Sequence, residues 1–89
     1  MNEQEFSAQL GAQGYGEAKS GAYDVGPPGD EHAHDFSVSG MVLAGTFILT
    51  TGEGARAMVA GDTWVLAAGT PHREQVVGDE PARIIYGVK

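Results

Sequence analysis

The chain has 89 residues, of which 42% are hydrophobic and 19% charged, and no apolar run is long enough to span a bilayer, so we expect one small domain. Twelve acidic residues against five basic ones give a formal net charge of −7, which argues against nucleic acid and anionic membrane surfaces as partners. The sequence has no cysteine, which excludes disulfides, thiolate metal sites and cysteine nucleophiles.

The first segment, residues 1–14, is predicted to form a short helix. Asn2 is a suitable N-cap, and Glu5 stands three residues later in the capping-box position. Phe6 and Leu10 then share one helical face, which we expect to pack across one side of the domain. The polar, acidic start lacks the basic and apolar regions of a secretory signal, so we expect a cytoplasmic protein.

Residues 15–89 are predicted to form short strands, because 14 glycines punctuate β-branched and aromatic runs along the chain. Gly26–Asp30, which contains two prolines, is a predicted turn, and Thr51–Gly54 is a predicted hairpin tip. The predicted strands are Tyr15–Val25, Glu31–Ser37, Met41–Thr51, Arg56–Ala60, Trp64–Ala67, His72–Val77 and Arg83–Val88. Strands of this length and spacing after a single helix indicate an all-β sandwich or barrel.

The chain contains only three histidines, and they carry most of the functional information. His32 and His34 are two residues apart, so on a strand both imidazoles point to the same face. Neutral imidazole is a common ligand of divalent transition metals, and a metal ion relieves the repulsion between two adjacent histidines. A pair of exposed histidines on a barrel rim explains the spacing as well, so the pair alone leaves both interpretations open.

Two segments resemble the two motifs of the cupin family. From Gly26 to Gly45 the chain reads G-x5-H-x-H-x3-V-x6-G, where the family has G-x5-H-x-H-x3-E-x6-G. From Gly61 to Val76 it reads G-x5-A-x-G-x2-H-x3-V, where the family has G-x5-P-x-G-x2-H-x3-N. The gap between them, residues 46–60, lies at the short end of the family's range, and every histidine falls on a family ligand position.

The resemblance implies a small single-domain cupin of the RmlC-like superfamily. Its fold would be a double-stranded β-helix, also called a jelly-roll barrel, over residues 15–89, with the N-terminal helix beside it. His32, His34 and His72 would hold one divalent transition metal, namely Fe, Zn, Ni or Mn. Because small cupins commonly pair and this core is small, we also expect a homodimer.

The chain departs from the family pattern at one ligand position, where Val38 replaces the usual glutamate. Three imidazoles leave one more open coordination position, and some cupins with a three-histidine site are Fe(II) dioxygenases acting on thiols or diketones. Glu74 would face the same way as His72 on a strand. It is therefore a candidate fourth ligand or partner of the ligands, with a solvated carboxylate beside Arg73 as the alternative.

Five apolar side chains are candidates for the wall of a small-molecule pocket beside the metal, and ordinary core packing is the alternative for each of them. They are Phe36, Val38, Val42, Phe47 and Trp64. No residue pattern selects a general acid or base, so the catalytic residues stay unassigned. The resemblance implies a metal-dependent enzyme such as a dioxygenase acting on a small molecule. A non-catalytic binding or sensor protein, with the metal structural or the pocket metal-free, is the alternative.

Overall fold

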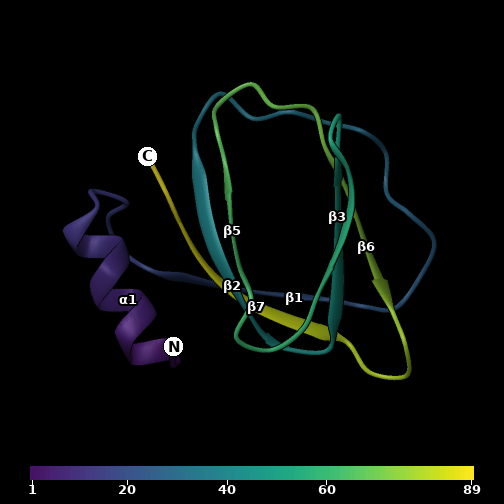
Figure 1. Ribbon diagram of the computed structural model, residues 1–89, viewed down its shortest axis with the longest axis horizontal. Helices are drawn as coiled ribbons and strands as arrows, with labels where there is room; N and C mark the ends of the chain where they lie inside the picture. The colour runs from purple at the N-terminus through teal and green to yellow at the C-terminus, as the bar shows by residue number, and fades with distance from the viewer.

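The computed structural model describes residues 1–89, which form one helix followed by strands (Figure 1). The elements are α1 (Glu3–Ala12), β1 (Lys19–Tyr23), β2 (Val38–Ala44), β3 (Thr46–Thr51), β4 (Gly54–Met58), β5 (Thr63–Leu66), β6 (Arg73–Val77) and β7 (Ala82–Val88). The all-β class with one short helix is therefore as predicted. No helix in the structure is long and apolar enough to cross a membrane.

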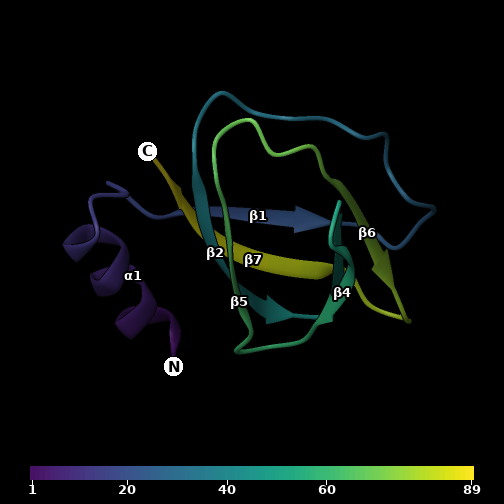
Figure 2. The same ribbon diagram turned by 45° about the horizontal axis from the view of Figure 1, so that its top comes forward.

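The strands form two antiparallel sheets that face each other, as Figures 1 and 2 show. The order is β1-β7-β2-β5 in one sheet and β4-β3-β6 in the other. Alternate side chains of both sheets meet between them, where they form the main core. That core contains Val42, Phe47, Leu49, Met58, Trp64, Leu66, Val76, Ala82 and Ile84.

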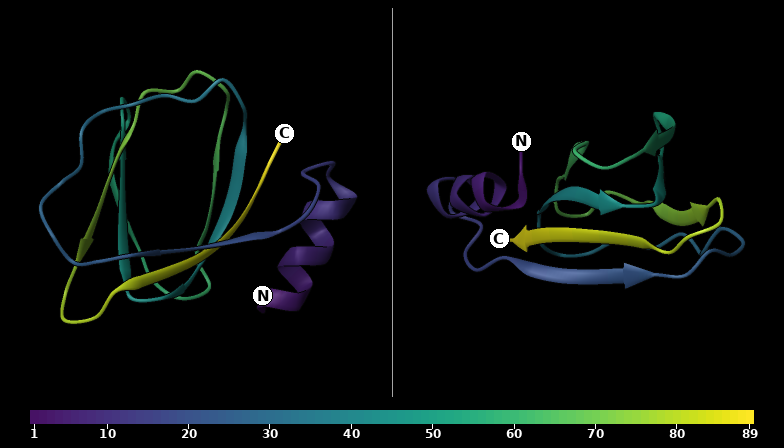
Figure 3. Two further views of the ribbon diagram at one scale, coloured as in Figure 1. Left: turned by 180° about the vertical axis from the view of Figure 1, so that it is seen from behind. Right: turned by 90° about the horizontal axis from the view of Figure 1, so that it is seen from below.

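Helix α1 lies outside the space between the two sheets, against the outer face of the larger one (Figure 3). Its first turn is closed by the predicted capping box: the Asn2 side-chain oxygen accepts from Glu5 N–H at 2.8 Å, and the Glu5 carboxylate accepts from Asn2 N–H at 3.0 Å. Phe6 and Leu10 are buried in a second cluster, which includes Ile85 of β7. Strand β7 is therefore covered on both faces.

One predicted strand is in fact two. Met41–Thr51 is divided at Gly45, so that β2 belongs to the larger sheet and β3 to the smaller. Gly45 has a φ of 77°, and a β-carbon there would lie 2.6 Å from the Pro81 carbonyl oxygen. A residue without a side chain therefore allows the chain to turn from one sheet into the other.

The prediction of a strand over Glu31–Ser37 is wrong. The connection between β1 and β2 is irregular, and His32 alone makes a bridge, with His72. The connection instead touches its neighbours at separated points: Gly29 N–H donates to the Glu74 carbonyl at 2.9 Å, and Ser37 N–H donates to the Lys89 carbonyl at 2.8 Å. Because Glu74 lies on β6 of the smaller sheet and Lys89 directly follows β7 of the larger one, the segment spans one end of the barrel and does not extend a single strand.

Candidate metal centre

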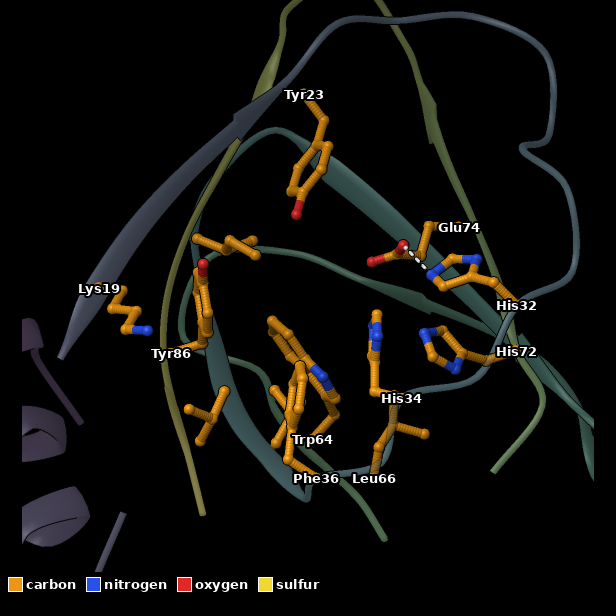
Figure 4. A pocket seen from close by; sticks show the side chains of 13 residues that line it. Lys19, Tyr23, His32, His34, Phe36, Trp64, Leu66, His72, Glu74 and Tyr86 are labelled. Carbon is orange, nitrogen blue, oxygen red and sulfur yellow. Dashed lines mark ion pairs between the residues drawn. The ribbon is translucent and has the colours of Figure 1, made fainter. Parts of the chain in front are cut away.

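The three histidines converge at the end of the barrel that the β1–β2 connection crosses (Figure 4). His32 and His72 exchange both backbone hydrogen bonds, each 2.9 Å long, which places their rings side by side with centroids 4.3 Å apart. The His34 carbonyl accepts from Gly69 N–H at 2.7 Å, and its ring centroid lies 5.1 Å from each of the other two. One ring nitrogen of each histidine lies within 4.8 Å of the others.

The backbone fixes which ring nitrogens face the centre. His32 Nδ1 lies 3.0 Å from the Asp30 carbonyl oxygen, and His72 Nδ1 lies 2.9 Å from the Thr70 carbonyl oxygen. A carbonyl oxygen only accepts hydrogen bonds, so each Nδ1 carries the hydrogen and each Nε2 keeps its lone pair in the neutral ring. Hydrogen bonds of this kind orient histidine ligands in metal sites.

The third ring is oriented by packing. His34 stacks on Phe36 with centroids 4.8 Å apart and an interplanar angle of 6°. Burial increases from His32, which is exposed, through His34, which is half-buried, to His72, of which only 3% is exposed. The cluster therefore has one side toward the core and one side open to solvent.

Glu74 lies beside this cluster on β6, where strand alternation turns it to the same side as His72. Its Oε1 is 3.3 Å from His32 Nε2, and its side chain is half-buried. A cation shared between the two groups would make this contact attractive, because a neutral imidazole nitrogen and an ionised carboxylate oxygen are both acceptors. The sequence prediction placed Glu74 on the correct side of the strand, and its carboxylate stands outside the group of three ring nitrogens.

The donor set fits a divalent transition metal. Three ring nitrogens share one small space, two of them keep a free lone pair, and a carboxylate stands next to them. Imidazole nitrogen suits Fe, Zn, Ni and Mn to different degrees, and the fold supplies no cysteine that would select a softer ion. His32, His34 and His72 would hold the metal on one face, which leaves the solvent side for further ligands.

A cavity of about 400 Å³ opens beside the histidines. Of the predicted wall residues, Phe36, Val38 and Trp64 line it. Val42 and Phe47 do not line it, and both are fully buried in the core. Val42 lies toward the Gly45 end of β2, whereas Val38 begins that strand. The Phe47 ring is covered by Trp64 at 5.3 Å and Tyr23 at 5.8 Å between centroids.

Six of the thirteen residues that line the cavity were not predicted to do so. These residues are Lys19, Tyr23, Leu66, Ile84, Tyr86 and Val88, of which the last three alternate along β7. That alternation is visible in the sequence, but it does not show which of the two faces of a doubly covered strand points into the barrel.

Tyr23 reaches into the cavity with its hydroxyl (Figure 4). Burial raises the pKa of Tyr23 above its usual value of 10.0, and the neighbouring Glu74 carboxylate and Tyr86 hydroxyl raise it further. The phenol therefore keeps its proton at neutral pH and acts as a hydrogen-bond donor in the cavity.

The cupin domain family matches residues 21–87 of this chain. The chain belongs to the cupin family. The match includes both motifs and all three histidines of this cupin. None of the curated proteins matches the sequence.

Solved structures agree on the fold. A cupin-2 domain protein from Shewanella frigidimarina superposes with a TM-score of 0.66 at 19% identity, over 82% of this chain and 68% of that one. KdgF from Halomonas superposes with a TM-score of 0.68 at 23% identity, over 81% of this chain and 68% of that one. Oxalate oxidase in complex with the substrate analogue glycolate superposes with a TM-score of 0.69 at 21% identity, over 81% of this chain and 40% of that one.

This cupin covers between 40% and 68% of the length of those three chains. The structural likeness confirms that its fold is the predicted double-stranded β-helix.

Proposed function

We propose that this cupin holds one divalent transition metal on His32, His34 and His72 and uses it to bind and activate a small organic molecule. The proposal rests on one observation: the three imidazoles present ring nitrogens within 4.8 Å of one another, while His32 and His72 donate a hydrogen bond from their other ring nitrogen to a backbone carbonyl. Such an arrangement of acceptors suits a cation at their centre.

The reaction class we propose is the O₂-dependent oxidation of a small molecule. A metal in this site would supply Lewis acidity and, as Fe(II), a place for O₂ to bind. Val38 occupies the usual glutamate position, so no carboxylate of that motif fills the remaining coordination space. Tyr23 would donate a hydrogen bond to an oxygen of the bound molecule, and Phe36 and Trp64 would exclude water from its apolar part.

A binding protein without turnover is the second candidate, and the exposure of the site favours it. The His32 side chain is 40% exposed, so a metal held there would lie within reach of solvent. Enzymes that generate reactive species usually enclose them, because water and stray proton transfer divert the reaction.

The metal site is tested by titrating metal-free, untagged protein with Co(II), Ni(II) and Zn(II), followed by calorimetry and by the fluorescence of Trp64. Trp64 is the only tryptophan and lines the cavity, so its emission reports on the site. We expect one ion per chain in the wild type and none in His34→Ala. Because the Glu74 carboxylate stands beside the Nε2 of His32 that would face the ion, Glu74→Gln removes a nearby negative charge and should lower the metal affinity.

Arg73→Ala is the matched control, since Arg73 is exposed on the same strand and should bind metal as the wild type does. Metal bound by His34→Ala with wild-type stoichiometry and affinity would contradict the site.

Oxygen uptake separates the two candidate functions. Fe(II)-loaded protein is mixed with small thiols and β-diketones in an oxygen electrode, beside free Fe(II) and His72→Ala as controls. Uptake above both controls supports an oxygenase. Ligand binding to the loaded protein without uptake supports the binding protein.

A further inference from the structure

The cavity has two chemically different ends (Figure 4). The three histidines and Glu74 stand at one end, on the β1–β2 connection and at the start of β6. Lys19 and Tyr86 stand at the opposite end, on β1 and β7. The Tyr23 hydroxyl points into the space between them. The wall that joins the two ends is apolar and consists of Phe36, Val38, Trp64, Leu66, Ile84 and Val88.

Lys19 is the only basic residue that lines the cavity, in a protein with five basic residues. It pairs with Tyr86 in the β1–β7 register and shares the inward face of β1 with Tyr23. It has no acidic partner, because the one ion pair in the structure joins His32 and Glu74. Lys89, in contrast, donates to the Gln13 carbonyl at 2.9 Å and lies over an aromatic ring.

The Tyr86 hydroxyl at the Lys19 end and the Tyr23 hydroxyl between the two ends are also available to bind a ligand. Tyr23 is exposed and Tyr86 half-buried, and neither hydroxyl makes a hydrogen bond within the protein, although both rings line the cavity. An ammonium group and phenolic donors together recognise an anionic oxygen group, and hydrogen bonds with a charged partner are the stronger kind. The overall charge of −7 disfavours anions at long range, so a local cation is needed to hold one here.

We infer that the cavity binds a small organic acid with two separated anionic groups, such as an aliphatic dicarboxylate. One carboxylate occupies the metal end, which rests on the proposed function, and the other accepts hydrogen bonds from Lys19 and the nearby tyrosine hydroxyls. The carbon chain between them lies along the apolar wall. Lys19 then sets specificity by selecting ligands with a second anionic group.

The test compares dicarboxylates from malonate to adipate with the monocarboxylates of equal chain length. Binding to Zn(II)-loaded and metal-free full-length protein is measured by calorimetry and Trp64 fluorescence, with the metal content determined on each sample. We expect the best dicarboxylate to bind about tenfold more tightly than its monocarboxylate counterpart. Lys19→Gln should remove this preference and leave the metal content unchanged, and Tyr86→Phe should reduce the preference in part.

Lys89→Gln is the matched control and should keep the preference, because Lys89 lies outside the cavity. The inference is overturned if Lys19→Gln keeps the preference, if the metal-loaded wild type shows none, or if no carboxylate binds at all. Failure of the metal site is recognised separately by the metal content. In that case, carboxylate binding to the metal-free protein that is lost in Lys19→Gln still supports the anion site. Carboxylate binding that does not depend on Lys19 overturns it.

Discussion

Trp64 connects the core with the candidate site at the scale of single residues. It stands opposite Gly40 in the β2–β5 register, and its indole lies directly over that glycine. A β-carbon at Gly40 would be 2.3 Å from ring atoms of the indole. The same ring packs against Phe47 and forms part of the cavity wall. The position of the wall therefore depends on the absence of a side chain at Gly40.

Gly40→Ala should accordingly destabilise the protein, because the added methyl group forces the indole out of its place. We expect the free energy of unfolding in urea to fall by about 1–3 kcal/mol. Gly11→Ala is the control: nothing lies within 4 Å of a β-carbon there, and alanine favours the helix by roughly 0.5–1 kcal/mol. Equal stability of Gly40→Ala and the wild type would show that the indole moves freely.

The residues of the candidate metal centre could be brought together from the sequence because their spacing along the chain is short. His32 and His34 were placed by their separation and motif, and Glu74 by strand alternation after His72. Lys19 could not be predicted, since its place in the cavity depends on the pairing of β1 with β7, about sixty residues later in the chain. Hence one end of the cavity could be predicted from motifs, and the other end only from topology.

At the scale of elements, α1 and the cavity lie on opposite faces of the larger sheet. Leu10 is fully buried against that sheet together with Met41 and Ile85, whereas Tyr86 and Val88 of β7 face the cavity. The helix therefore stabilises the sheet from outside and contributes no residue to the candidate site.

Leu10→Ala should lower the free energy of unfolding by about 2–5 kcal/mol, because it leaves a cavity under the helix. The folded variant should bind metal with wild-type affinity, which a parallel titration checks. Gln4→Ala, at an exposed position of α1, should change stability by less than about 0.5 kcal/mol. A loss of metal affinity in folded Leu10→Ala would show that the helix acts on the site through the sheet.

Element boundaries were predicted best where the residues that determine them lie within a few positions of one another in the sequence. The capping box of α1 and the Thr51–Gly54 hairpin were confirmed. The division of Met41–Thr51 and the irregular connection over Glu31–Ser37 were not predicted. Both depend on how the chain passes from one sheet to the other, which hydrophobic pattern and turn residues do not determine.

At the scale of the whole molecule, the core is small, with 18 of 89 residues buried. The larger sheet also ends in two edge strands, β1 and β5, whose backbone groups remain available for pairing. For these reasons we propose a homodimer. Light scattering at micromolar concentration should give about twice the 9.3 kDa mass of one chain, and a mass of 9.3 kDa would refute the proposal.

The metal content of the purified protein decides whether His32, His34 and His72 hold a metal ion. Untagged wild type and His72→Ala are prepared in parallel and analysed by plasma mass spectrometry, without a histidine tag that would bind metal itself. We predict about one equivalent of a single transition metal per chain in the wild type and none in His72→Ala. No metal in either sample, even after reconstitution, would contradict the proposed three-histidine site. The protein would then be a cupin barrel whose cavity binds no metal ion.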